Sequence, residues 1–162
     1  MKKISSGLAL AVLMLTTLGY AQSGPTNDTQ VFAWTGTDSN HSLNVQIGLD
    51  GEVTTLNEYS NNGPAIARFH NLYYLAWTGT GGHLNYATSA DGRTWSEATT
   101  LLGEESNLGP TLVVSPSGAT IYLGWTGTDR RLNYVSSTGG VFGNKQTTNQ
   151  TSPYAYSLLI VH

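Results

Sequence analysis

Apolar residues recur at the two-residue spacing of β-strands over most of this chain. The clearest run is Leu72–Thr78, whose two faces are both apolar enough to be buried in a stack of sheets. Runs at Ala65–Phe69, Leu84–Ser89 and Trp95–Leu101 predict three further strands. Asp91-Gly92 is a hairpin turn signal between the last two. These residues therefore predict one four-stranded antiparallel unit.

Two short sequence motifs, which we call phrases, repeat along the chain in register with each other. Thr-Gly-Thr follows each of Trp34, Trp77 and Trp125, which are 43 and 48 residues apart, and Gly-Pro closes both Ser60–Pro64 and Ser106–Pro110. Four strands in a period of 40–50 residues are typical of a β-propeller blade. We therefore predict an all-β chain of about three propeller-type blades, each a four-stranded antiparallel sheet. The expected units are residues 22–60, 61–106 and 107–152, with a final strand at 153–162.

The first 21 residues have the three parts of a secretory signal peptide. Lys2 and Lys3 form a positive start, Leu8–Leu18 is apolar, and Gly19-Tyr20-Ala21 supplies small residues for a cleavage site. The apolar run is too short for a membrane-spanning helix. We expect a mature domain at 22–162 that is secreted or periplasmic, with no membrane insertion after cleavage.

Charge and composition exclude several classes of partner and site. Without Lys2 and Lys3, five basic residues stand against ten acidic ones, a formal charge of −5 that argues against nucleic acid and anionic membrane surfaces. The chain has no cysteine, so packing rather than disulfides must hold an exported fold together. The four histidines show no metal-ligand spacing and no phosphate or dinucleotide motif is present, so we expect no metal and no cofactor.

The segment Ser89-Ala90-Asp91-Gly92-Arg93-Thr94-Trp95 resembles the Asp-box of the sialidase-like (BNR-repeat) β-propellers. It is one residue shorter between Asp and Gly than the family pattern, Ser-x-Asp-x-Gly-x-Thr-Trp. In that family the box lies on the turn between the third and fourth strands of a blade, which is where the strand pattern places it here. The resemblance implies that Asp91 accepts hydrogen bonds from turn amides and that Trp95 packs between blades.

Three blades fall short of a closed propeller, which needs about four to eight. Trp34 follows Pro25 by nine positions, against 13 from Pro64 to Trp77, so the first blade lacks its first strand. The apolar run Tyr154–His162 starts where a first strand should start. Two explanations stay open. Either this strand completes the first blade of a second copy, giving a homodimer with a six-bladed ring, or the chain is a fragment of a longer propeller.

The catalytic residues of sialidases cannot be transferred to this sequence. That chemistry uses three arginines that grip a substrate carboxylate, a tyrosine nucleophile paired with a glutamate, and an aspartate acid/base. Arg93 belongs to the Asp-box turn. Arg130 and Arg131 are adjacent on one turn, so they do not converge easily with Arg68 from three blades. We therefore name no catalytic residue and favour a protein that is not an enzyme.

The two repeated phrases predict a binding face. In a propeller, the loops between second and third strands share one face with the loops that join successive blades. Short hydroxyl, amide and carboxylate groups on those loops suit the hydroxyl groups of sugars, and repeated weak sites gain avidity. The ligand-binding residues expected on this face are Thr37, Asp38, Asn61, Asn62, Thr80, His83, Asn107, Thr128, Asp129 and Arg130.

The repeated tryptophans, and Asn44, Asn85 and Asn133 of the Leu-Asn phrase, have two interpretations: ligand contact or a role in the fold. We favour the fold, with tryptophan packed between blades and asparagine bonded to the preceding turn. The function predicted is an exported, non-catalytic carbohydrate or cell-surface binding protein, a lectin-like propeller whose partners are glycans. The alternatives are a sialidase-like glycoside hydrolase, active in a larger or oligomeric propeller, and a purely structural or assembly role.

Overall fold

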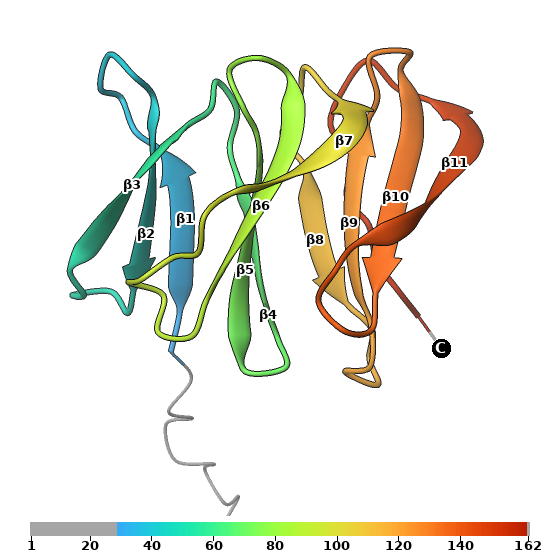
Figure 1. Ribbon diagram of the computed structural model, residues 1–162. Coiled ribbons are helices and arrows are strands. Elements are labelled where there is room, and N and C mark those ends of the chain that lie inside the picture. Colours follow the sequence, from blue (N-terminus) through green and yellow to red (C-terminus); the bar gives the residue numbers. More distant parts are fainter. Residues whose placement is uncertain (1–28, 162) are drawn as a thin grey trace, which may run out of the picture.

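The computed structural model describes residues 29–161, so the predicted signal peptide and residues 22–28 lie outside the described part. Three antiparallel sheets stand side by side in a row (Figure 1). Blade 1 contains β1 (Val31–Thr35), β2 (Ser42–Ile47) and β3 (Val53–Tyr59). Blade 2 contains β4 (Ala65–Phe69), β5 (Leu72–Thr78), β6 (His83–Ser89) and β7 (Thr99–Glu105). Blade 3 contains β8 (Thr111–Val114), β9 (Ile121–Thr126), β10 (Arg131–Ser137) and β11 (Gly143–Thr151).

Within each blade the strands are neighbours in the order of the sequence, as in a propeller blade. The predicted all-β fold of about three propeller-type blades is confirmed. Trp34 on β1 corresponds to Trp77 on β5 and Trp125 on β9, which are second strands of their blades. Blade 1 therefore has no inner strand among residues 29–161, as the spacing before Trp34 predicts. No helix of the described region could cross a membrane.

The strands of blade 2 match the predicted ones except for the last. The prediction of a strand at Trp95–Leu101 is wrong, because β7 spans Thr99–Glu105. Trp95 belongs instead to the turn after β6, where its indole Nε1 donates to Gly92 O at 3.2 Å. The apolar side chain that suggested a strand is used to anchor this turn.

In all three sheets, a tryptophan on one strand stands directly opposite an asparagine on the neighbouring strand. The pairs are Trp34 with Asn44, Trp77 with Asn85, and Trp125 with Asn133. Each asparagine Nδ2 donates to the backbone carbonyl two residues earlier, at 2.9–3.0 Å, and each Oδ1 accepts from a threonine hydroxyl of the outer strand at 2.7 Å. Both ends of the amide are used inside the blade. The favoured fold role of the asparagines is confirmed.

The apolar core lies between the blades rather than within them. Leu43 and Val45 of blade 1 pack with Leu75 and Trp77 of blade 2. A second cluster joins blade 2 to blade 3 and includes Trp125. Trp77 and Trp125 are each 1% exposed, which confirms the predicted packing role for these two tryptophans. Trp34 is only half-buried, because it lies on the outer face of blade 1.

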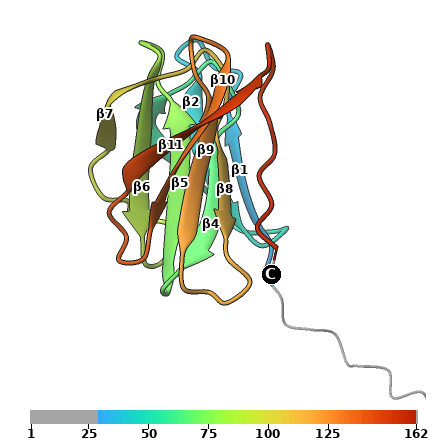
Figure 2. The same ribbon diagram turned by 90° about the vertical axis from the view of Figure 1, so that its right-hand side faces the viewer.

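The predicted final strand at 153–162 is not formed in the single chain, where residues 154–161 pair with no strand. The segment nevertheless lies along blade 3, on the end of the row that faces the viewer in Figure 2. Tyr156 Oη donates to Asn133 O, and its ring lies against Gly124, where an added Cβ would clash with Tyr156 Oη. Burial raises the pKa of the Tyr156 phenol to about 12. The segment is docked, but it has no neighbouring strand with which to form a ladder.

Candidate functional site

The turn between second and third strands and the loop that leaves each blade meet on one end of the row, as predicted. The same backbone bond joins them three times: Ser60 N donates to His41 O, Ser106 N to Gly82 O, and Ser152 N to Arg130 O. The acceptor in each case has a positive φ, of 57°, 86° and 67°. We call this end of the row the loop face; it is the upper end in Figure 1.

A polar cleft opens on the loop face of blade 3, with a volume of about 270 Å³. It lies between the loop before the blade and the loop after it, and we call it the loop cleft. Its polar side chains range from exposed Asn107, Thr128 and Arg130 to buried Thr126. The residues that shape it include Asn107, Thr126, Thr128, Arg130, Ser152 and Pro153.

A second cleft, of about 210 Å³, lies on the other side of the 127–130 turn. We call it the acidic cleft, since Glu104 and Glu105 of β7 and Asp129 of the turn border it. Lys145 Nζ contacts Glu104 Oε2 at 2.6 Å and lies 5.5 Å from the centre of the Trp125 ring. The lysine therefore neutralises one carboxylate and limits access to the ring.

The other two carboxylates of the acidic cleft face water. Asp129 Oδ1 accepts from Arg131 N at 3.0 Å, and its side chain is 61% exposed. Glu105 is 3.6 Å from His83 Nδ1 and is 53% exposed. These exposed carboxylates are accessible to hydroxyl groups of a ligand, from which their oxygens can accept hydrogen bonds.

Four of the ten predicted ligand residues border these clefts: Asn107, Thr128, Asp129 and Arg130. The other six lie on the same loops but have local partners or stand free in solvent. Asp38 accepts from Asn40 N and Ser42 N inside its own turn. Asn61 Oδ1 is 2.8 Å from His41 Nδ1, and His83 faces Glu105. Thr37 and Thr80 are exposed.

Asn62 joins the two loops that flank blade 2 on the loop face. Its Nδ2 donates to Asn107 O at 3.2 Å and so bridges the loops before and after blade 2. Leu108 occupies the matching position before blade 3, because both Asn62 O and Leu108 O accept from the threonine that follows a repeated tryptophan. Leucine cannot make the amide bridge, so this hydrogen bond does not join the two loops around blade 3, where the loop cleft lies.

Sequence reasoning missed several cleft residues. Glu104, Glu105 and Lys145 lie on outer strands, and no repeated phrase marks them. Ser152, which was also missed, does carry a signal, since Ser152-Pro153 is a shortened copy of the loop phrase. Within residues 29–161 no group of three or more His, Cys, Asp or Glu side chains is arranged to hold a metal ion.

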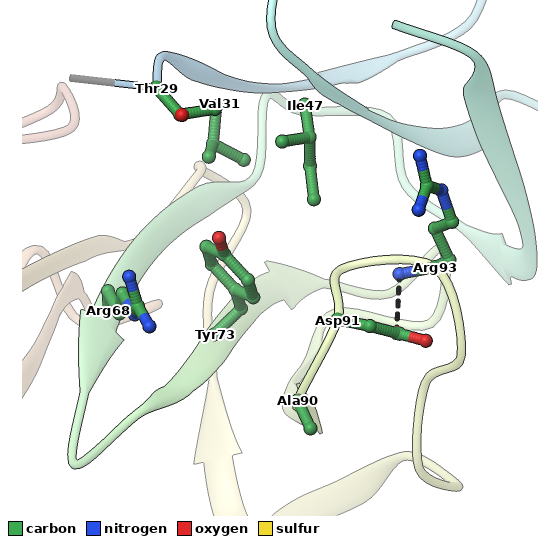
Figure 3. Close-up of a pocket in the computed structure, with 8 residues that line it drawn as sticks. All are labelled: Thr29, Val31, Ile47, Arg68, Tyr73, Ala90, Asp91 and Arg93. Carbon is green, nitrogen blue, oxygen red and sulfur yellow. Dashed lines mark hydrogen bonds between the residues drawn. The ribbon is translucent and has the colours of Figure 1, made fainter. Parts of the chain in front are cut away.

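A larger cavity, of about 540 Å³, lies at the opposite end of blades 1 and 2 (Figure 3). Arg68 and Tyr73 line one side of it, with the guanidinium 5.5 Å from the ring centre, and the turn holding Asp91 and Arg93 lines another. Ile47 of blade 1 contributes an apolar wall. None of the predicted ligand residues lies here.

The Asp91 turn has the structural role that the sequence predicts. Asp91 Oδ1 accepts from Thr94 N at 2.7 Å and from Arg93 N at 2.8 Å, and these bonds lower the pKa of its carboxyl group to about 2. Ser89 Oγ accepts from Gly92 N at 2.8 Å. Trp95 packs against the core between blades 1 and 2. Asp91 is thus an acceptor for the amides of its own turn.

The arrangement defines a class of protein by fold: a row of propeller-type blades with polar clefts between its connecting loops. No protein-family model matches the sequence, and the search of curated proteins finds no match. Among solved structures, the fold is similar to that of a fucose lectin from Kordia zhangzhouensis in complex with methyl-fucoside. The two share 12% sequence identity, with a TM-score of 0.54, over 76% of this chain and 92% of that one.

Proposed function

We propose that this protein binds carbohydrate, with the loop cleft of blade 3 as the principal sugar site. The observation that carries the proposal is the geometry of the 127–130 turn. This exposed turn lies between two polar clefts and brings hydroxyl, amide, carboxylate and guanidinium groups within one small region. These are the groups that pair with sugar hydroxyls.

Cleft size supports a small ligand. A volume of about 270 Å³ lies just under the ~300–1,000 Å³ of pockets that hold drug-sized molecules, so the loop cleft suits a single sugar ring or the end of a glycan. The fucose lectin with a similar fold was solved with methyl-fucoside, and this supports methyl-fucoside as the first probe. The acidic cleft would accept hydrogen bonds from a neighbouring sugar of a longer glycan.

Three further proposals accompany this function. The signal-peptide pattern at residues 1–21 supports export, where glycans of cell surfaces and secreted polysaccharides are accessible. The turn around Asp91 supports the resemblance to sialidase-like propellers, as a fold relationship without the catalytic set. Pairing of two chains would present the loop clefts of both on one assembly and raise avidity.

A glycan array with the full chain tests the binding proposal, using Arg130→Gly as the site variant. Glycine suits this position because Arg130 has φ 67° and Gly82 occupies the same place in blade 2. Arg93→Ala is the matched control, since Arg93 is an exposed arginine at the opposite end of the blades. We expect a wild-type signal that falls at least tenfold in Arg130→Gly and persists in Arg93→Ala.

Two outcomes would contradict this assignment. Silence of the folded wild-type chain across the array would remove carbohydrate binding. A signal lost in Arg93→Ala but kept in Arg130→Gly would move the site to the cavity of Figure 3. Turnover of fluorogenic glycosides, lost in Asp129→Asn, would instead favour the hydrolase alternative.

A further inference from the structure

The two outer faces of the row carry residues whose counterparts are buried inside it. Trp34 on blade 1 is half-buried, whereas Trp77 and Trp125 at the same position are each 1% exposed. At the other end, Tyr134 on blade 3 is half-buried, while its counterpart Tyr86 is 7% exposed in the core between blades 2 and 3. Within residues 29–161, blade 1 therefore has no preceding blade beside it, and blade 3 has no following blade.

A repeated serine bonds each blade to the next, and in the described part of the chain the series leaves one serine and one threonine, at opposite ends of the row, without this contact. Ser60 Oγ donates to Thr78 O and Ser106 Oγ to Thr126 O, both at 2.7 Å, so each serine bonds the threonine that follows the next tryptophan. Ser152 holds this position after blade 3, with its backbone N bonded to Arg130 O. The remaining threonine of the series is Thr35, which follows Trp34 on blade 1.

Residues 154–161 occupy the path of an inner strand. Thr126 Oγ1 donates to Tyr154 O, as Thr78 Oγ1 does to Leu108 O just before β8. Beyond Tyr154, exposure alternates with the two-residue period of a strand: positions 156, 158 and 160 are half-buried and positions 155, 157, 159 and 161 are exposed. Counting from Tyr154 as β8 is counted from Leu108, residues 157–160 match Thr111–Val114 of β8.

The edge that this segment would pair with is β1. β4 pairs with β5 and β8 with β9, which are the second strands of blades 2 and 3, and β1 is the second strand of blade 1. Figure 1 shows blade 1 and blade 3 at opposite ends of the row, so β1 of the same chain is out of reach. An unpaired edge with a half-buried tryptophan beside it is a site for another strand.

The number of copies follows from the size of closed propellers. Rings contain about four to eight blades. Two chains of three blades give six, and three chains give nine. A head-to-tail contact that closes after two copies satisfies both open ends of each chain. Two copies of the three blades at residues 29–161 therefore fit a closed ring within this range.

We propose that two copies of this chain close a six-bladed ring by exchanging residues 155–161, each of which completes blade 1 of the other copy. The register follows from blades 2 and 3, where Ala65 pairs with Ala76 and Thr111 with Gly124, the residues just before the repeated tryptophans. In the exchanged pair, Ser157 stands opposite Ala33 of the second copy, Leu158 opposite Phe32, and Leu159 opposite Val31. The inference deepens the proposed pairing of chains and does not depend on glycan binding.

The exchange buries side chains that the single chain leaves in water. Leu159 is 77% exposed, Val161 is 74% exposed and Phe32 is 41% exposed. Leu159 and Val161 match Ala67 and Phe69 of β4, whose side chains lie in the core between blades 2 and 3. In the ring they would enter the core between blades 1 and 2 of the second copy.

The same exchange completes a cleft on blade 1. The loop cleft of blade 3 has one wall from the loop before the blade, at Asn107, and one from the loop after it, at Ser152. Among residues 29–161, blade 1 of a single chain supplies the later wall, at Ser60 and Asn61. Pro153 of the second copy would supply the other, so the pair would place the predicted ligand residues Thr37 and Asn61 in a complete cleft.

Native mass spectrometry of the full chain tests the pairing without any ligand, so its failure is distinct from a failure of glycan binding. We expect twice the mass of one chain for the wild type. Leu159→Asp should give a folded monomer, because the charge would enter the core of the ring. Leu102→Asp is the matched control, since Leu102 on β7 is 91% exposed and lies away from both ends of the row. A monomeric wild type, or a dimer that persists in Leu159→Asp, would overturn the proposal.

The register has a separate test in a chain that contains no cysteine. Directly opposite residues of an antiparallel pair have Cα atoms about 4.5–5.5 Å apart, within the range of a disulfide. The variant with both Ala33→Cys and Ser157→Cys should run as a covalent dimer on a non-reducing gel. The variant with Ala33→Cys and Leu159→Cys, shifted by two residues on the same face, should cross-link at least tenfold less. Equal cross-linking, or none in the first variant, would contradict the exchange.

Discussion

Replacing Trp77 with alanine should destabilise the protein strongly, because this side chain joins blade 1 to blade 2. Trp77 is 1% exposed and packs with Leu43 and Val45 of the neighbouring blade. Removing such a ring costs about 3–5 kcal/mol through lost burial and the cavity left behind. That is a large part of the ~5–15 kcal/mol that stabilises a typical domain. At about 3–5 °C for each kcal/mol in a chain of this size, we expect the Tm to fall by roughly 10–20 °C.

Differential scanning calorimetry of Trp77→Ala measures this loss, and Trp34→Ala is an internal comparison. Trp34 has the same place in its blade but is half-buried in a single chain. In the monomeric Leu159→Asp background, Trp34→Ala should lower the Tm much less than Trp77→Ala does. In the closed ring, the two substitutions should lower the Tm by similar amounts. A Tm change under about 2 °C for Trp77→Ala, or loss of glycan binding without loss of stability, would refute the packing role.

The remaining predictions concern hydrogen bonds. Asn133→Ala should cost about 1–3 kcal/mol in urea unfolding, because Asn133 is 3% exposed and bonds at both ends of its amide, while Asn149→Ala on the exposed β11 should cost under about 0.5 kcal/mol. Asp91→Asn should lower the Tm at pH 7. Since the folded pKa of Asp91 is lowered from 3.8 to about 2, the charge stabilises the fold above pH 4, and the difference from the wild type should disappear as the pH falls to 2. A difference that stays constant over this range would contradict that role. Ser106→Ala should lower the Tm of a monomeric variant more than Ser152→Ala, because Ser106 Oγ bonds the next blade at Thr126 O, whereas Ser152 Oγ accepts from Tyr154 N of its own loop.

The repeat was predictable because its signals are local. Alternation at Leu72–Thr78 and the Trp-Thr-Gly phrases define strands and turns whose side chains pack on equivalent neighbours in each blade. The absence of an inner strand of blade 1 among residues 29–161 also follows from spacing alone. The start of β7 was predicted too early because Trp95, an apolar residue shortly before the strand, resembles a strand residue. The indole of Trp95 instead bonds to the turn.

The clefts were only partly predictable because they depend on contacts between different loops and strands. Asn62 and Leu108 have matching positions in the loop phrase, yet only Asn62 bridges the loops, through Asn107 O. Lys145 reaches Glu104 across 41 residues of sequence, between blades 2 and 3. Neither contact leaves a periodic pattern in the chain, so the different contacts of equivalent loops appear only in the folded structure.

Chemical-shift mapping on the ¹⁵N-labelled chain tests the central claim most directly, because it reports both whether a sugar binds and where. The titration uses methyl-fucoside first and then a panel of other methyl glycosides. The account predicts saturable shifts at the amides of Gly127–Arg130, Asn107 and Ser152, with little change around Asp91. Shifts confined to the Asp91 turn, or none with any glycoside on the folded chain, would contradict it.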